Sequence, residues 1–248
     1  MKSSPSSLHR GFTLLETVIA IGVLAVLLTG FMLVFSPAAE GIRKSINVQE
    51  ADRLASALEQ ELVTLREGEE TTDIATGFDK AFNFIEGSDT AADALLVYQY
   101  RGNADPTRVR TDGTPEPVAS VKDKIPGKDF IVVSMARKAS DNLFSNENTG
   151  DISAVEGAVY LVKCTQLVFG NGNNAGLELG DPGKIVDPKD TQNTASSGST
   201  YSDAVIAFAA DFYMLPAKNA AFFSGSAFAN SFNNMKTPVF TRNLAVRR

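Results

Sequence analysis

The longest apolar run of the chain lies close to its N-terminus. From Phe12 to Phe35, 24 residues contain one charged side chain, that of Glu16. As an α-helix this run would be about 36 Å long, against a bilayer hydrocarbon core of about 30 Å. The pattern therefore predicts a membrane-spanning helix over residues 12–35. Because a carboxylate at the middle of such a helix costs about 2.5–3.5 kcal/mol, Glu16 is expected to have a partner and a function.

An amphipathic stalk helix is predicted directly after the span, over residues 36–67. From Leu54 to Leu65 the apolar side chains recur every three or four positions, and charged residues occupy the other face. Pro37 should kink or briefly break the helix near its start, and Gly68 should stop it. The segment would thus present one apolar face to the rest of the chain.

Beyond residue 68 the pattern changes to short runs rich in β-branched and aromatic residues, which favour strands over helices. We predict an α+β fold in which an antiparallel sheet packs on the stalk helix, so that residues 68–248 form one soluble head domain. Residues 69–93 should connect stalk and sheet, with one short helix. The strand-like runs are Ala94–Tyr100, Phe130–Met135, Ala158–Val162 continued by Gln166–Phe169 with room for a bend at Cys164, and Ala204–Phe208 followed by Asp211–Leu215.

Three further segments are predicted to be loops. Residues 101–128 contain six basic and four acidic side chains, a net charge of +2, and should form a solvated loop; DNA capture through Arg108 and Arg110 is the alternative. Residues 170–203 are rich in Gly, Asn, Asp, Ser and Thr, and should form a long, partly disordered loop. Residues 216–238 should be a loop that docks its phenylalanines on the core.

The loop over residues 170–203 holds the candidate metal ligands of the chain. Asp181, Asp187 and Asp190 supply carboxylate oxygens, the ligand type that calcium prefers. Their spacing does not match the D-x-D-x-D-G pattern of a calcium-binding loop. We therefore expect no cofactor, and keep calcium binding at these three aspartates as a hypothesis.

The start of the apolar run carries a specific signature. Residues 11–16 read GFTLLE and follow a short polar leader that ends in His9-Arg10. This segment closely resembles the type IV prepilin signature, which type II secretion pseudopilins and competence pilins share. The resemblance implies a leader of residues 1–11, cleavage by prepilin peptidase between Gly11 and Phe12, and N-methylation of Phe12.

The residue types suit the roles that the resemblance implies. Gly11 has no side chain, so a peptidase can approach its backbone closely. Cleavage would leave an α-amino group at Phe12 that is largely protonated at neutral pH. In a filament, Glu16 of one subunit would meet this amino group of its neighbour, because a desolvated charge is tolerated when it is paired. The pair would also set the axial step between subunits.

Two alternatives stay open for the apolar run. A secretory signal peptide would be cut after residues 36–38, but its apolar region usually has about 7–15 residues. A plain signal anchor would leave Glu16 without a role. The basic residues before the span roughly balance those after it, so charge does not set the orientation. The prepilin resemblance implies a single-pass protein of the inner (cytoplasmic) membrane, with its head in the periplasm or outside.

Composition argues against several classes of protein. The net charge of −6 does not favour nonspecific binding to DNA, so nucleic acid is not an expected partner. Cys164 is the only cysteine, which rules out an intramolecular disulfide, and we expect a buried structural thiol. His9 is the only histidine and lies in the predicted leader, so the mature chain would lack a Ser-His-Asp unit and a histidine-ligated metal site. We expect no enzymatic activity.

Together these features predict a structural subunit, a minor pilin or pseudopilin, of a type IV pilus-like or type II secretion filament. Its expected partners are prepilin peptidase, other pilin or pseudopilin subunits, the inner-membrane assembly platform and the lipid bilayer. Two other functions stay open. One is a membrane-anchored binding protein that never assembles, and the other is a DNA-uptake (competence) pilin.

Overall fold

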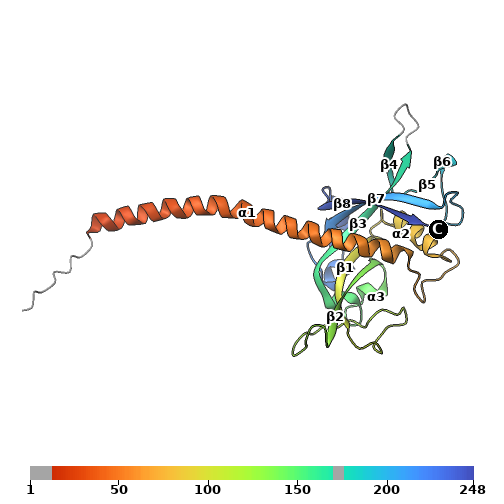
Figure 1. Ribbon diagram of the computed structural model, residues 1–248, viewed down its shortest axis with the longest axis horizontal. Helices are drawn as coiled ribbons and strands as arrows, with labels where there is room; N and C mark the ends of the chain where they lie inside the picture. The colour runs from red at the N-terminus through yellow and green to blue at the C-terminus, as the bar shows by residue number, and fades with distance from the viewer. Residues whose placement is uncertain (1–12, 170–175) are drawn as a thin grey trace, which may run out of the picture. The chain divides into compact units, whose positions relative to one another are not determined.

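A computed structural model describes residues 13–169 and 176–248 of the chain (Figure 1). The chain divides into two compact units, Met1–Asn47 and Val48–Arg248. The first unit consists of helix in its described part, and the second holds every strand of the described chain. The predicted α+β class, a long N-terminal helix followed by an antiparallel sheet, is confirmed.

Helix α1, Leu14–Val63, is the predicted long N-terminal helix. Among the described residues it is the one helix whose length and composition would let it cross a membrane. Pro37 lies inside α1, so the predicted break there is wrong: proline removes one N–H donor, and the hydrogen bonds of the adjoining turns keep the helix continuous. The helix ends at Val63, five residues before Gly68, so Gly68 is not its stop. Gly68 has a φ of +86° and lies in the turn that follows the helix.

The second unit is built on one antiparallel sheet with the strand order β2-β1-β3-β7-β8, and β4 also pairs with β3. The four predicted strand regions are confirmed as β1, β2, β3 and β7; β1, β2 and β3 are longer than their runs, and β7 joins its two runs into one strand. The strands are β1 Leu95–Asn103, β2 Phe130–Lys138, β3 Val155–Phe169, β4 Leu177–Pro182, β7 Val205–Met214 and β8 Phe240–Arg247.

Two features of the sheet were not predicted. Strand β3 runs through Cys164 as one 15-residue element, because β7 pairs with it on both sides of that residue and holds it extended. Strand β8 escaped sequence reasoning because Arg242 interrupts its inward apolar positions, Phe240, Leu244 and Val246. A strand at the edge of a sheet needs just one buried face, which leaves a weak hydrophobic pattern.

The predicted short helix between stalk and sheet is confirmed as α2, Gly77–Gly87. A capping box fixes its start, since the side chain of Thr76 accepts a bond from the backbone of Asp79 and the Asp79 carboxylate bonds back to Thr76. The remaining short elements are α3 Asn142–Ser145, the 3₁₀ turn Asp151–Ala154, β5 Val186–Asp187, β6 Asp190–Thr194, α4 Ala220–Ser224 and α5 Ser226–Asn234.

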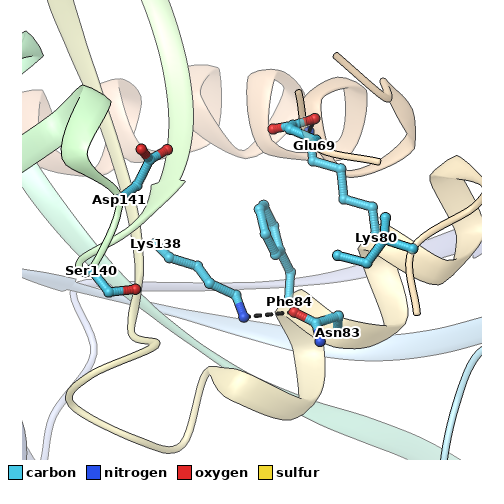
Figure 2. Close-up of a pocket in the computed structure, with 8 residues that line it drawn as sticks. Glu69, Lys80, Asn83, Phe84, Lys138, Ser140 and Asp141 are labelled. Carbon is cyan, nitrogen blue, oxygen red and sulfur yellow. Dashed lines mark hydrogen bonds and ion pairs between the residues drawn. The ribbon is translucent and has the colours of Figure 1, made fainter. Parts of the chain in front are cut away.

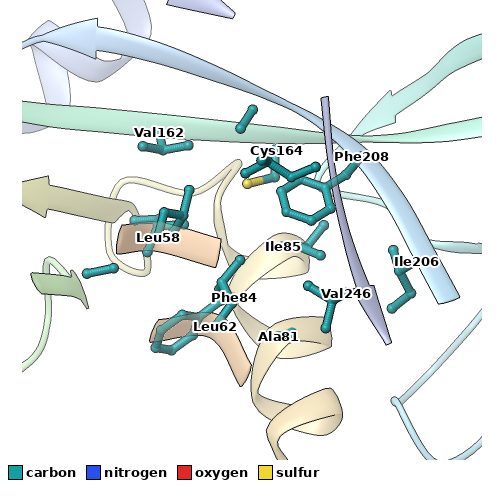
Figure 3. Close-up of a cluster of buried hydrophobic side chains, with 14 of the residues drawn as sticks. Leu58, Leu62, Ala81, Phe84, Ile85, Val162, Cys164, Ile206, Phe208 and Val246 are labelled. Atoms are coloured by element: carbon teal, nitrogen blue, oxygen red, sulfur yellow. The ribbon is translucent and has the colours of Figure 1, made fainter. Parts of the chain in front are cut away.

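Both faces of the sheet are covered. On one face Leu54, Leu58 and Leu62 of α1 pack with α2 and with the sheet side chains around Cys164 (Figure 3). Tyr98 lies on the other face, where the second core cluster is completed by side chains from α3, the 3₁₀ turn and α5. The stalk helix therefore buries the predicted apolar face, and a second layer that the sequence did not reveal covers the opposite side.

Two predicted loops contain regular structure. The described part of 170–203 includes β4, β5 and β6, so the loop prediction is wrong there: β4 is held by backbone pairing with β3, which composition does not encode. Residues 216–238 contain α4 and α5 instead of a plain loop. The docking of its phenylalanines is confirmed, because Phe228 and Phe232 are 5% and 4% exposed within the second core.

Candidate functional site

The start of α1 carries the candidate site, and a capping box organises it. The backbone N–H and hydroxyl of Thr13 donate to Oε2 of Glu16, at 3.0 and 2.9 Å, and the N–H of Glu16 donates to the Thr13 hydroxyl at 3.3 Å. Both residues thereby satisfy N–H groups that a helix start leaves without intrahelical partners. Gly11 and Phe12, the predicted cleavage site, lie outside the described residues.

Sequence reasoning assigned Glu16 a partner in another subunit and overlooked its partner in its own chain. The signal was present: a threonine followed three positions later by a glutamate is the capping-box spacing. A carboxylate at a helix N-terminus is also favoured by the helix dipole. Among bonds to described residues, only Oε2 of Glu16 is used. The Oε1 atom can therefore accept a bond from an amine while the cap stays in place.

Behind this cap, the first unit presents an apolar surface on all sides of the helix. The large apolar side chains from Leu14 to Phe35 are between 52% and 86% exposed. Phe31 and Phe35 stack on each other with ring centroids 3.8 Å apart, and protein does not otherwise cover them among the described residues. A surface of this kind is covered by lipid or by other apolar helices.

The structure does not gather the three calcium candidates into a carboxylate cluster. Asp181 forms an ion pair with Lys184 at 3.1 Å, and Asp187 accepts bonds from the backbone and hydroxyl of Ser202. Asp190 lies opposite Asp187 across the β5–β6 ladder. Within the described parts of the chain, no group of three or more His, Cys, Asp or Glu side chains could hold a metal ion.

The two arginines considered for DNA capture have partners within the head. Arg108 pairs with Glu116 at 2.8 Å and is 60% exposed. Arg110 is 10% exposed and donates to Asp151 at 2.5 Å and to the backbone oxygen of Leu143 at 3.1 Å. The expectation of a solvated loop is thus wrong for Arg110, because its guanidinium compensates a fully buried carboxylate.

That carboxylate belongs to a buried ionic network around Arg137. Arg137 donates to Asp112, Asp151 and Asp141 and is 3% exposed. The hydroxyl of Tyr98 donates to Asp151 at 2.5 Å. Burial acts to raise the pKa of Asp112, but the hydrogen bonds from Arg137 and Thr114, together with the charge of Arg137, outweigh it and lower the pKa to about 2. The network joins the 101–128 segment to the sheet, so its role is structural.

A small cavity of about 260 Å³ lies beside α2 and β2 (Figure 2). Phe84 forms its apolar wall, with the amines of Lys80 and Lys138 at 5.4 and 5.6 Å from the ring centroid. Both amines are engaged within the chain, since Lys80 donates to Glu69 at 2.7 Å and Lys138 to Asn83 at 2.6 Å. These pairings connect α2 to its neighbours and engage both amines within the chain.

The thiol of Cys164 is buried, as predicted. Its residue is 0% exposed, and burial raises the pKa of the thiol to about 12, so it is protonated and unreactive at neutral pH. The backbone N–H of Cys164 donates to the hydroxyl oxygen of Ser88 at 3.0 Å.

Comparison with known proteins identifies the N-terminal segment. Residues 6–32 match the family model described as the prokaryotic N-terminal methylation motif. No curated protein and no solved structure matches the chain, so the comparison assigns no function to the head. The match spans the predicted cleavage site, the Thr13–Glu16 cap and most of the apolar run. The chain therefore carries a prokaryotic N-terminal methylation motif, and the predicted resemblance of this segment to the type IV pilin and pseudopilin signature is confirmed.

Proposed function

We propose that the protein is a structural, non-catalytic subunit, a minor pilin or pseudopilin, of a type IV pilus-like or type II secretion filament. The observation that carries the proposal is that three features occur together in the N-terminal segment. These are the methylation motif over residues 6–32, the capped carboxylate of Glu16, and an apolar helix surface that protein does not cover among the described residues.

In this proposal prepilin peptidase cleaves between Gly11 and Phe12 and methylates the new amine of Phe12. The precursor is anchored in the inner membrane by residues 12–35, with its head in the periplasm or outside. The assembly platform then transfers the subunit into a filament, where neighbouring apolar helices replace lipid.

Glu16 acts at two levels in this scheme. Its Oε2 atom accepts the two bonds from Thr13, and Oε1 accepts a hydrogen bond from the α-amino group of Phe12 in the neighbouring subunit. Pairing the two charges removes the penalty of burying either one alone. Because the donor and acceptor belong to different subunits, the bond fixes the axial step of the filament.

Mass spectrometry of the protein extracted from its own membranes tests the processing step. We expect an N-terminal peptide that begins with methylated Phe12. An intact N-terminus beginning at Met1, or a terminus created by cleavage after Ala38, would contradict the proposal.

The assembly step is tested with Glu16→Ala and a matched Thr17→Ala control, one position along the helix. Glu16→Ala should still insert into the membrane and should be lost from sheared or cross-linked filaments. Thr17→Ala should be incorporated normally. Equal incorporation of the two variants would refute the role of Glu16.

A further inference from the structure

The amine of Lys138 lies against the side-chain amide of Asn83 (Figure 2). Lys138 belongs to β2 and Asn83 to α2, 55 positions apart in the chain, and Nζ donates to Oδ1 at 2.6 Å. A contact of this length places Nζ about 3.4 Å from the amide carbon Cγ, within the range of about 3–3.5 Å for reacting atoms that are poised to combine. A nucleophile and an electrophile that could form an amide bond are therefore adjacent.

The amine is confined by its surroundings. The side chain of Lys138 is 19% exposed, and its Nζ lies 5.6 Å from the centre of the Phe84 ring. A Cβ atom at Gly87, one helical turn after Asn83, would lie 3.3 Å from this Nζ, so the glycine leaves room for the amine beside α2. Because the amine and the amide come from a strand and a helix of the same packed head, their separation is held by regular structure.

Two carboxyl groups beside the pair can move the protons that amide formation requires. Oδ1 of Asp93 lies 3.5 Å from Nζ of Lys138 and can accept its proton. Glu86 follows Asn83 by three positions on α2, so the two side chains share a face of the helix. Burial raises the pKa of Glu86, against the charge of Lys138, so this carboxyl takes up a proton more readily than usual.

From this arrangement we propose that Lys138 and Asn83 form an intramolecular amide cross-link between β2 and α2. Asp93 takes one proton from the Lys138 ammonium group, and the neutral amine attacks Cγ of Asn83 to form the new C–N bond. The bond from Cγ to Nδ2 then breaks, as the attacking nitrogen gives up a second proton and the departing nitrogen gains one. Ammonia leaves with the proton that Asp93 held, as ammonium, so atoms and charge balance without an oxidant, a reductant or a further reactant.

The cross-link would give the head a covalent constraint that its cysteine content cannot supply, since Cys164 is the only cysteine. It would close the 55 positions between Asn83 and Lys138 into a loop, which restricts the unfolded chain in the way a disulfide does. In the described chain nothing accepts a hydrogen bond from Nδ2 of Asn83, and this residue lines the cavity of about 260 Å³, which offers ammonia a path out. The inference is independent of the proposed function, because it concerns the head and not filament assembly.

Peptide mass spectrometry of the full chain, extracted from its own membranes and denatured, tests the cross-link. Trypsin cuts after arginine and lysine, but not after a lysine whose amine is acylated. We therefore expect peptides 81–101 and 138–163 joined as one species, lighter than their sum by the mass of ammonia, about 17 Da. The separate peptides 81–101 and 139–163 at full yield would overturn the proposal, as would an Asn83 converted only to aspartate.

Three variants separate the roles of the residues. Lys138→Arg keeps the charge and removes the amine, so the joined species should disappear and the chain should migrate more slowly in a denaturing gel. Asp93→Asn should slow formation of the joined species about 100-fold, followed over time in newly made protein. An unchanged rate would refute the part given to Asp93. Lys184→Arg is the matched control, because its ion pair with Asp181 is exposed, and it should leave the joined species intact.

Discussion

Replacing Arg137 by methionine should cost the head several kcal/mol of unfolding free energy. The Arg137 guanidinium is 3% exposed and donates to Asp112 at 2.5 Å and to Asp151 at 3.2 Å. Breaking a buried ion pair costs about 3–5 kcal/mol, because a buried charge is left uncompensated. Asp151 keeps its bonds to Arg110 and Tyr98, so we expect the lower end of that range, about 3 kcal/mol.

The measurement is urea unfolding of the full chain in detergent, followed by near-UV circular dichroism. The chain has no tryptophan, so the tyrosines give this signal, and Tyr98 contacts the network directly. Arg108→Met is the matched control, because its pair with Glu116 is exposed and should contribute less than about 1 kcal/mol. If the two variants lose the same stability, the network does not act as a buried ionic unit.

Three other perturbations have defined outcomes. Asp112→Asn should reduce the pH dependence of the free energy of unfolding between about pH 4 and pH 2. The folded pKa of Asp112, about 2, lies below the usual value of about 3.9, so its carboxylate stabilises the fold above that window. This stabilisation is lost as the pH falls through the window. A titration of stability against pH, with Asp73→Asn as an exposed control, checks this. Leu58→Ala should cost about 2–5 kcal/mol in urea unfolding because the side chain is 0% exposed, whereas Val63→Ala, 46% exposed on the same helix, should cost under about 1 kcal/mol. Equal costs would mean that α1 does not bury this face. Thr13→Val removes the capping hydroxyl and should lower the stability of the first turn of α1 by about 1 kcal/mol, which faster amide hydrogen exchange in micelles would show. Thr13→Ser keeps the hydroxyl and should not change the exchange rate.

Local sequence patterns predicted much of the architecture. The spacing from Leu54 to Leu62 identified the buried face of α1, and the β-branched runs identified four strands. Where the pattern failed, the missing information was non-local. Strand β4 is extended because it pairs with β3, and Arg110 is buried because Asp151, 41 residues further along the chain, needs a counter-charge.

The sequence by itself determined the membrane-spanning run, the methylation motif and the absence of an internal disulfide, because each depends on residue identity or on neighbours within a few positions. Only the tertiary structure decided the strand order, the second layer over the sheet and the buried ionic network. These features depend on contacts between distant residues, whose pairing is chosen by the packing and electrostatics of the whole head.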